Sequence, residues 1–571
     1  MIRLLICFGL ILCLSLGCDS AEPPGEPVRA AESVTEYKRT RLLAGVPAVR
    51  PNPNEDAPLI ALVDVEAEVP VVVALEINDG ARQWTWRPQM IPARMQSVVL
   101  LGLRPNRQHS IVVRVENPGE NTYDLSEPIT FETPPLPKSF PPLQTTVSKP
   151  DRMEPGVTLF PVNIWVNDVD LMDFGYLMIL DAAGEVVWYL KTGHRTATVQ
   201  ILDNGHLLYN HAGYRRMIEV NLLGDVVREW HAANIAPAPN SDSIPIACDT
   251  LHHEILPIED GKFLALSTRM QELTDFRRSL YDENERGPVS VVGDEIVEFQ
   301  SDGKVLRRLN LFDILDIDRL CYGVFGNFWN NKYLETGVED TEDWTHANAI
   351  MRTDEKDWIV VSLRHQDCLI KLNFATGEIR WILGDHDGWD EPWKSKLLAK
   401  QGDWDWPYHQ HGPQITSRGT IIMFDNGNYR AIPPELITGG SENYSRVLEL
   451  KVDEENMTVS KVWEYRGKGH EEFYSPFYGE ADVLPQTGNI LVTDGGHIEF
   501  ADGRPADVPP SDHQWARVFE ITYDTPAEIL WEVRLETPVE RQLGWSVYRS
   551  ERIKSLEPFA EKLQAESGSR K

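Results

Sequence analysis

The sequence predicts an all-β protein: a six-bladed β-propeller preceded by a small β-sandwich of the fibronectin or immunoglobulin type. One repeating unit is an apolar strand, a short polar turn and a second strand usually ending in Trp, at 176–190, 217–230, 295–309, 368–383, 446–465 and 517–534. A second unit, an apolar strand pair preceded by a polar residue, lies at 198–209, 252–267, 346–362, 411–424 and 479–493. Four strands in roughly 70–80 residues are typical of propeller blades, because solenoid repeats are shorter.

One apolar strand, at 545–553, is left over near the end of the chain. We expect it to pair with the first hairpin, at 176–190, so that the two ends of the propeller close one blade. The Trp residues at the hairpin ends are predicted to be core residues, because large aromatic side chains dominate the packing of such sheets. They are Trp188, Trp230, Trp381, Trp463 and Trp531.

The N-terminal residues have the pattern of an export signal. Arg3 precedes an apolar run at 4–16 that is too short to span a bilayer, and Cys18 follows it. Residues 1–18 are therefore predicted to be a signal peptide of the lipoprotein type, with an ordinary cleaved signal as the alternative. Residues 19–56, rich in Pro, Ala and Glu, are predicted to be a flexible tether. The expected location is the periplasm or cell envelope, with membrane attachment by lipid at Cys18.

The remaining boundaries follow from changes in composition. Apolar runs between 57 and 135 predict the β-sandwich, which is also a candidate surface for a homodimer. Residues 136–156 are Pro-rich and predict a linker. The propeller is then assigned to 157–555 and a charged tail to 556–571.

The charge and the missing motifs exclude several function classes. With 88 acidic and 55 basic residues the net charge is −33, whereas nucleic-acid binders usually display a basic face, so we expect no nucleic-acid partner. The acidity has a simpler explanation in solubility. The chain has no GxxxxGK[ST], HExxH or GxSxG motif, and no GxGxxG between a strand and a helix. Cys248, Cys321 and Cys368 are too far apart for a CxxC site. No cofactor and no metal are predicted.

Polar side chains precede several of the inner strands and predict one shared site. They are His252, His253, His346, Asn348, Arg364, His409 and His411. Alternate residues of a strand share a face, so His346 and Asn348 are expected to point the same way, as are His409 and His411. Glu480 and Asp482 begin another inner strand and are expected to be solvated or structural.

These motifs together resemble the bacterial arylsulfotransferase family. The resemblance rests on HHEIL at 252–256, HAN at 346–348 with SLR at 362–364, QH at 410–411 before FDNGN at 424–428, and VYR at 547–549. It extends over residues 57–555. It implies an exported six-bladed propeller that moves a sulfo group from a phenolic sulfate ester to an acceptor phenol, without a nucleotide sulfate donor. Some members have a disulfide near the nucleophile, but 400–411 holds no Cys here.

The resemblance also implies residue roles. His411 would be the nucleophile and form a sulfohistidine. Arg364 and Asn348 would donate to the sulfate oxygens. His346 would exchange a proton with the phenol oxygen. Of the pair His252 and His253, which supplies another donor, we expect His253 to face the site.

Alternatives remain open at this point. His409 is an alternative nucleophile, and Arg364 is alternatively a structural ion-pair partner of Asp367 or Glu254. Tyr548 and Arg549 are expected to lock the closing strand, with phenol stacking as another role for Tyr548. A metal-dependent hydrolase would use His252 or His253, His346 and His411 as zinc ligands. A propeller that only binds ligands is the second alternative.

Overall fold

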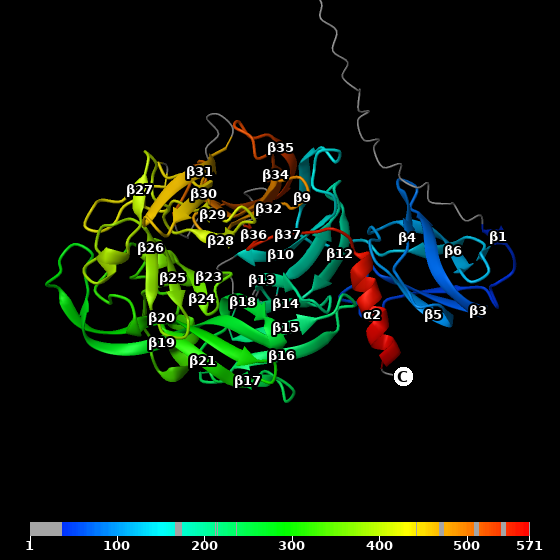
Figure 1. The fold of residues 1–571 in the computed structure, drawn as a ribbon, viewed down its shortest axis with the longest axis horizontal. Helices are drawn as coiled ribbons and strands as arrows, with labels where there is room; N and C mark the ends of the chain where they lie inside the picture. Colours follow the sequence, from blue (N-terminus) through cyan, green and yellow to red (C-terminus); the bar gives the residue numbers. More distant parts are fainter. Residues whose placement is uncertain are drawn as a thin grey trace, which may run out of the picture.

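A computed structural model describes residues 37–165, 174–211, 213, 215–235, 237–440, 442–467, 473–507, 513–537 and 544–569. The predicted signal peptide, Cys18 and the tether up to residue 36 lie outside these residues. Six sheets are arranged around a common centre, so the predicted six-bladed propeller is confirmed (Figure 1). None of the helices in the described ranges combines the length and the apolar character needed to cross a bilayer.

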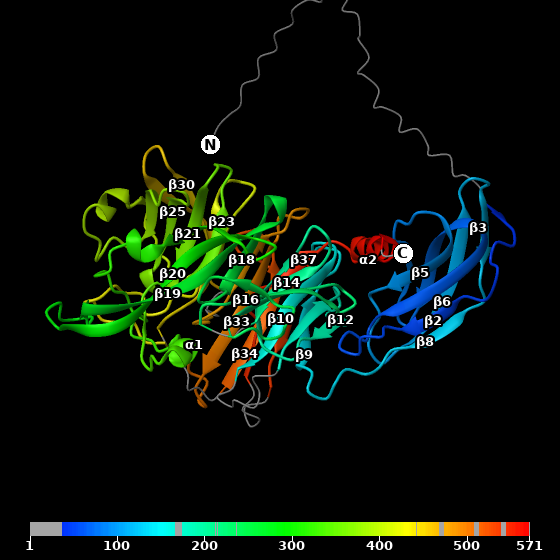
Figure 2. The same cartoon turned by 90° about the horizontal axis from the view of Figure 1, so that it is seen from below.

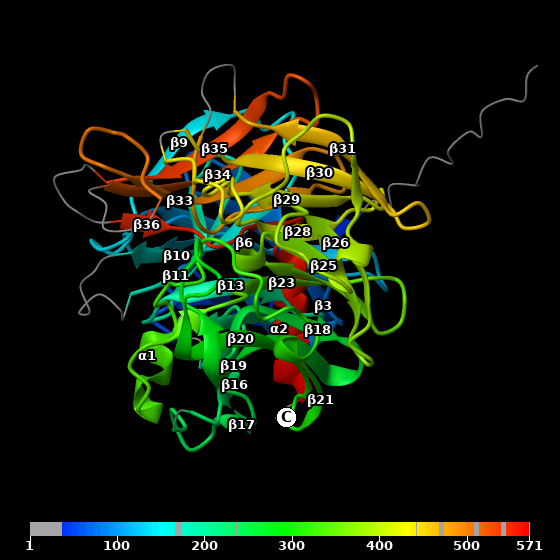
Figure 3. The same cartoon turned by 90° about the vertical axis from the view of Figure 1, so that its left-hand side faces the viewer.

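Each blade has four antiparallel strands that run from the centre outward, in some blades with a short extra strand. Figure 3 shows this order across the fifth blade, from β28 to β31. Blade 1 contains β36 (Gly544–Ser546), β37 (Glu551–Ile553), β10 (Val157–Trp165), β11 (Tyr176–Leu180) and β12 (Val186–Lys191). Blade 2 contains β13 (Thr196–Ile201), β14 (Leu207–His211), β15 (Arg216–Val220), β16 (Val226–Ala232) and β17 (Ile244–Ile246). Blade 3 contains β18 (His252–Ile258), β19 (Lys262–Arg277), β20 (Arg286–Gln300), β21 (Val305–Asn310) and β22 (Glu342–Asp343).

The other three blades repeat the same order. Blade 4 contains β23 (Ala347–Arg352), β24 (Trp358–Leu363), β25 (Cys368–Asn373) and β26 (Ile379–Gly384). Blade 5 contains β28 (His411–Ile415), β29 (Ile421–Asp425), β30 (Arg446–Asp453), β31 (Thr458–Tyr465) and β27 (Ala399–Gln401). Blade 6 contains β32 (Glu480–Val483), β33 (Ile490–Glu499), β34 (His513–Ile521), β35 (Ile529–Leu535) and β9 (Leu143–Ser148). The five hairpin Trp residues are buried, as predicted.

The C-terminal strands close blade 1, but with a different neighbour from the one expected. They pair with β10, in the registers Asn163↔Ser546 and Thr158↔Arg552. The strand β10 therefore separates them from the hairpin at 176–190, and the predicted direct pairing is wrong. Pro161 lies in the middle of β10 and has no N–H to donate, which hides this strand in the sequence.

The predicted linker at 136–156 contributes a strand to blade 6. Within it, β9 pairs with β35 in the register Leu535↔Leu143, so the linker prediction is corrected for 143–148. Its outer position leaves β9 mostly exposed, and so it lacks an apolar pattern. The N-terminal side thus gives a strand to blade 6, and the C-terminal side gives two to blade 1.

The N-terminal domain is built from β1 (Lys38–Arg39), β2 (Ala48–Pro51), β3 (Ala61–Asn78), β4 (Gln83–Trp86), β5 (Ala93–Leu100), β6 (Gln108–Asn117), β7 (Thr122–Leu125) and β8 (Ile129–Glu132). The long β3 pairs with β5 before a register shift between Glu66 and Val71, and with β6 after it. Its classification as a sandwich stays a prediction. The tether prediction is wrong for the segment from residue 37, because Leu42 and Leu43 are buried and both donate backbone N–H groups to Asp124.

The described residues also contain two α-helices, α1 (Asn330–Tyr333) and α2 (Glu557–Ser569), and short 3-10 helices, one of them at Arg364–Gln366. The helix α2 lies between the N-terminal domain and the propeller (Figure 2). Its residues Phe559, Ala560 and Leu563 are buried in a cluster with apolar side chains of both, a spacing that places them on one helical face. The predicted charged tail is therefore an amphipathic helix that joins the two domains.

Candidate active site

An unusual backbone conformation recurs where the inner strands begin. His253, His346, His409 and Tyr478 have φ values of 48°, 46°, 55° and 63°, in the left-handed region that side chains other than Gly and Asn rarely adopt. They lie at or just before the start of the inner strands of blades 3 to 6. Because β23 begins only at Ala347 and β28 only at His411, strand alternation does not extend to His346 or His409. The prediction that His346 shares a face with Asn348, and His409 with His411, is therefore wrong.

His346 is held by a buried carboxylate. Its Nδ1 lies 2.5 Å from Asp343 Oδ2, and Trp329 Nε1 donates to the other oxygen of Asp343 at 2.8 Å. The ring of His365 lies 4.5 Å from that of His346, and its Nδ1 lies 2.8 Å from the backbone oxygen of Asp343. Burial lowers the pKa of His346 and raises the pKa of Asp343. A net-neutral Asp343–His346 pair that carries one exchangeable proton is the state that burial favours.

His252 and His253 lie one behind the other. Their Nδ1 atoms are 2.8 Å apart, and His252 Nε2 lies 3.1 Å from Asp294 Oδ1. The ring of His253 lies 5.1 Å from that of His346 and 5.9 Å from that of Tyr548. The structure therefore places His253 against His346, with His252 between His253 and Asp294.

His411 begins β28 and contacts an amide instead of a carboxylate. Its Nδ1 lies 2.7 Å from Asn426 Oδ1. Asn348 Nδ2 donates at 2.7 Å to the carbonyl of Gln410, so the Asn348 side chain also supports the peptide just before His411. Burial, and next the charge of Arg364, lower the pKa of His411 well below its usual value, which keeps its imidazole neutral at neutral pH.

Arg364 directly follows β24, beside His346, and contacts no carboxylate among the described residues. Its backbone N–H donates to the carbonyl of His346 at 3.2 Å, and its guanidinium reaches His365 Nε2 at 2.5 Å and the carbonyl of Pro476 at 3.2 Å. Across the described ranges, no carboxylate oxygen lies within ion-pair distance of this guanidinium. Asp367 contacts His409 and Glu254 contacts Arg549, so the predicted alternative of an Arg364 ion pair with either is wrong.

His409 has surroundings of its own. Its Nδ1 and its backbone N lie 2.8 Å and 2.7 Å from Asp367 Oδ1. Its ring lies 5.2 Å from that of Tyr429 and 5.6 Å from that of His365. Burial raises the pKa of Asp367 to about 7. His409 thus has a carboxylate partner like His346, whereas His411 has a neutral one.

The predicted zinc ligands do not match the group that the structure brings together. Among the described residues, Asp343, His346 and His365 offer ligand atoms within 4.8 Å of one another, and neither His411 nor His252 or His253 is among them. Two ligands of one tetrahedral zinc, each about 2.0–2.2 Å from the ion, lie about 3.3 Å apart. The 2.5 Å contact between Asp343 and His346 is shorter and is that of a hydrogen bond.

Three partners of the site were missed by sequence reasoning. Asp343 and His365 meet His346 from the two-residue strand β22 and a 3-10 turn, both too short to give a strand pattern in the sequence. Asn426 does have a signal, because it lies in the FDNGN motif. The register His411↔Phe424 places the end of β29 beside the start of β28.

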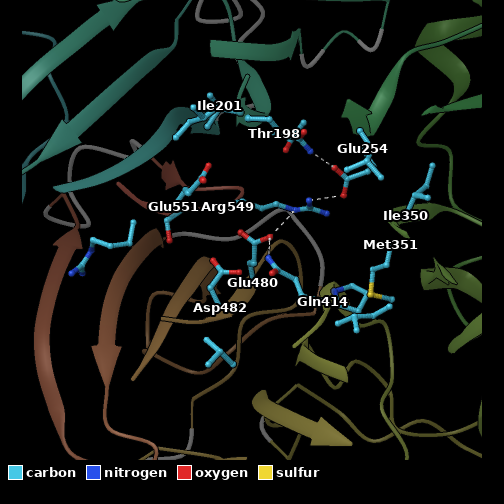
Figure 4. Close-up of a pocket in the computed structure, with 18 of the residues that line it drawn as sticks. Thr198, Ile201, Glu254, Ile350, Met351, Gln414, Glu480, Asp482, Arg549 and Glu551 are labelled. Atoms are coloured by element: carbon cyan, nitrogen blue, oxygen red, sulfur yellow. Dashed lines mark hydrogen bonds and ion pairs between the residues drawn. The ribbon is translucent and has the colours of Figure 1, made fainter. Parts of the chain in front are cut away.

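The inner strands of the blades surround the central channel of the propeller. Away from the histidines, the same strands line a separate pocket. A cavity of about 600 Å³ is lined by later residues of these strands, among them Ile350, Gln414 and Asp482. Figure 4 shows Arg549 between two carboxylates, with distances of 2.6 Å to Glu254 and 3.6 Å to Glu480. Glu480 is thus structural, in line with one of its two expected roles.

Arg549 also connects this pocket to the histidine cluster. It donates to the backbone oxygen of Asn348 at 3.0 Å. Together with its ion pairs, this contact fixes the segment between β36 and β37 against inner strands of other blades, in line with the expectation that Arg549 locks the closing strand.

Comparisons with known proteins agree on one family. The chain is 30% identical over 372 residues to the arylsulfate sulfotransferase AssT of Escherichia coli O6:H1, covering 58% of this chain and 59% of that protein. It is 28% identical over 371 residues to the AssT of Lelliottia amnigena, with the same coverage. The chain thus spans about three fifths of the length of these relatives.

Among solved structures, virginiamycin B lyase from Staphylococcus aureus matches with a TM-score of 0.30 and 9% identity, over 70% of this chain and 99% of that one, which is too weak to carry an argument. A sequence model described as arylsulfotransferase (ASST) matches residues 144–544, well over half of the chain. The chain belongs to the arylsulfotransferase family.

Proposed function

We propose that this protein is an aryl-sulfate sulfotransferase that moves a sulfo group from a phenolic sulfate ester to an acceptor phenol through a sulfohistidine at His411. The observation that carries the proposal is the pairing of a neutral, buried imidazole at His411 with a guanidinium at Arg364 that has no carboxylate partner in the described structure. An anionic sulfate ester would supply the negatively charged partner for the Arg364 guanidinium. Membership of the arylsulfotransferase family supports the same reaction.

In the first half-reaction, a lone pair on the imidazole of His411 attacks sulfur. The bond between sulfur and the imidazole nitrogen forms while the bond between sulfur and the phenolic oxygen breaks. The departing oxygen takes the exchangeable proton of the Asp343–His346 pair and leaves as a phenol. Arg364 donates to the sulfo oxygens, and the second N–H of the Asn348 amide adds an uncharged donor.

In the second half-reaction, the acceptor phenol gives its proton to His346 as its oxygen attacks sulfur. The bond between sulfur and nitrogen breaks, which returns neutral His411 and the protonated Asp343–His346 pair. Protons and charge therefore balance over the cycle. No nucleotide is needed, because the phenolic sulfate ester already carries an activated sulfo group. His253, against His346, supplies a further polar contact to the phenol oxygen or the sulfo group.

The proposed location is the cell envelope, with a lipid anchor at Cys18. Support comes from the sequence alone, through the apolar run at 4–16 and the cysteine that follows it. A Cys18→Ser variant that remains in the membrane fraction would argue against the anchor. A homodimer through the N-terminal domain is also proposed, and the mass of the purified protein in solution tests it.

The test of the reaction is mass spectrometry of the chelator-treated protein after brief exposure to 4-nitrophenyl sulfate. We expect one added sulfo group on a peptide containing His411, release of nitrophenol, and loss of the adduct when phenol is added. His411→Ala should lose both adduct and nitrophenol release, whereas His409→Ala should keep the adduct.

Other outcomes separate the alternatives. An adduct on His409 would move the nucleophile to that residue. Hydrolysis that returns only when zinc is added would favour the metal-dependent hydrolase. Bound 4-nitrophenyl sulfate that neither reacts nor leaves an adduct would favour a propeller that only binds ligands.

A further inference from the structure

The side chain of Asn426 can adopt only one hydrogen-bonded orientation. Two carbonyl oxygens, those of Ser475 and Tyr478, lie 2.8 Å from its Nδ2. Carbonyl oxygens only accept, so both must face the NH₂ group of the amide. Asn426 is fully buried, and no alternative partner in solvent is open to it. The amide oxygen is therefore directed at His411.

This orientation decides where the proton of His411 lies. Asn426 Oδ1 lies 2.7 Å from His411 Nδ1, and an amide oxygen cannot donate. Nδ1 must therefore carry the hydrogen. In a neutral imidazole with a proton on Nδ1, the lone pair in the ring plane is on Nε2.

The carbonyl groups that hold the Asn426 side chain come from the segment leading into the next blade. Ser475 and Tyr478 lie in the segment that leads into β32, and Ser445 Oγ donates to the backbone oxygen of Asn426 at 2.7 Å. Ser445 Oγ in turn accepts from the backbone N–H of Ser475 at 2.9 Å. The orientation of His411 in blade 5 thus depends on backbone groups supplied between blades 5 and 6.

We propose that Asn426 is a positioning residue that holds His411 in the tautomer with its proton on Nδ1, so that Nε2 is the atom that bonds sulfur. This inference rests on the proposed function and deepens it. As the bond between Nε2 and sulfur forms and the bond between sulfur and the phenolic oxygen breaks, the Nδ1 proton stays on the ring. The ring becomes cationic, and the Asn426 oxygen stabilises that charge without taking the proton.

The neutrality of Asn426 matters as much as its geometry. A carboxylate in the same place would favour the protonated ring, whose Nε2 has no lone pair to attack with. His346, which exchanges a proton in the proposed reaction, has such a carboxylate in Asp343 at 2.5 Å. His346 and His411 have the same kind of side chain, but the group that contacts Nδ1 is a carboxylate at His346 and a neutral amide at His411.

The experiment compares three variants by the pH dependence of the burst of nitrophenol from 4-nitrophenyl sulfate. Asn426→Ala removes the acceptor and should lower the burst rate constant at least tenfold while KM stays within about twofold. Asn426→Asp keeps an acceptor but adds charge, so the acidic limb of the pH profile should move up by about one pH unit. Above that limb the rate should recover most of the wild-type value.

Asn52→Asp is the matched control. The Asn52 side chain also donates to carbonyl oxygens, those of Ala57 and Leu223 at 2.9 Å and that of Asn54 at 3.3 Å, but it lies in the N-terminal domain. Asn52→Asp, like Asn426→Asp, places a carboxylate beside carbonyl oxygens and should lose stability for the same reason. Its pH profile and burst rate should match the wild type. A burst rate in Asn426→Ala within threefold of wild type, or an unshifted acidic limb in Asn426→Asp, would overturn the inference.

A second measurement does not depend on the Asn426 variants or on turnover. Nitrogen NMR of wild-type protein labelled at histidine, with His411→Ala to assign the signal, reports which ring nitrogen is bare. We expect Nε2 bare and Nδ1 protonated. A bare Nδ1 in a protein that still forms the sulfo adduct at His411 would overturn the tautomer and leave the proposed function standing. Wild-type protein with neither burst nor adduct would overturn both.

Discussion

Two arginines in the same channel are held in opposite ways. Arg549 lies between Glu254 and Glu480, which raise its pKa although burial alone would lower it. Arg364 bonds an imidazole nitrogen and a carbonyl oxygen instead, and burial lowers its pKa. The charge of Arg549 is already balanced within the protein. Arg364 forms no ion pair with a carboxylate of the described residues, which makes it the better anion-binding group.

The two ends of the channel extend this contrast. At the histidine end, burial lowers the pKa values of His253, His346 and His411. At the other end, burial raises the pKa of Glu480 to about 7. Burial acts in the same sense at both ends, since it disfavours charge. The two ends differ in the groups that contact each arginine. These groups make the histidine end suited to an anionic substrate, whereas the ion pairs at the other end hold the blades of the propeller together.

Arg549→Met should give the largest change, because it leaves two buried carboxylates unpaired. The exposed fractions of the side chains are 11% for Arg549, 5% for Glu254 and 7% for Glu480. Breaking a buried pair of this kind costs about 3 kcal/mol of unfolding free energy. Denaturant unfolding followed by circular dichroism measures it.

Arg352→Met is the control for this prediction. Its partner Glu259 is 69% exposed, and such surface pairs contribute less than about 1 kcal/mol. Equal losses in both variants would show that the Arg549 pairs do not hold the closing strand.

Arg364→Lys should lower turnover by about tenfold or more with little loss of stability. Lysine keeps the charge but lacks the planar fork that bonds two sulfate oxygens. Steady-state kinetics with 4-nitrophenyl sulfate and phenol measure the effect. Arg418→Lys, at an arginine that contacts Glu449 far from the histidines, should leave turnover unchanged. Full activity in Arg364→Lys would remove Arg364 from the reaction.

Glu480→Gln should give the smallest change, seen in the pH dependence of stability. The pKa of Glu480 is raised from 4.5 to about 7, so the folded protein binds more protons than the unfolded chain between these values. Unfolding free energy should therefore fall as pH rises from about 5 to 7.5. In Glu480→Gln the fall should be smaller. Measured by thermal unfolding, the drop in Tm between pH 5 and 7.5 should be smaller than in the wild type by on the order of 1–2 °C.

Glu259→Gln tests whether that slope is specific to the channel. Its carboxylate is exposed, and the hydrogen bond from Arg352 lowers its pKa. Its stability should change with pH above 5 as in the wild type. Identical slopes in Glu480→Gln and wild type would contradict a raised pKa at Glu480.

Repeats and turns were readable in the sequence because each blade repeats the same strand and turn chemistry. The hairpins at 217–230 and 368–383 are the outer strand pairs of blades 2 and 4. The strands by which the N-terminal part of the chain joins the propeller, β9 and β10, could not be predicted from the sequence. The strand β9 is mostly exposed and β10 contains Pro161, so neither has the apolar pattern of an inner strand.

The site divides in the same way. Its residues were found because they recur before inner strands, but the directions of His346 and His409 were not, since the left-handed backbone at both interrupts alternation. The partner Asp343 comes from the two-residue strand β22, and Asn426 directly follows the neighbouring strand β29. A strand pattern within one segment carries no information about such contacts.

The sequence by itself determined the number of blades, the hairpins that build them and the set of polar side chains at the start of the inner strands, because these depend on local periodicity and turn chemistry. Only the tertiary structure decided which histidine has a carboxylate on Nδ1 and which has an amide. It also decided which arginine is paired. Burial and partner charge, which set proton position and anion affinity, arise only when distant segments pack together.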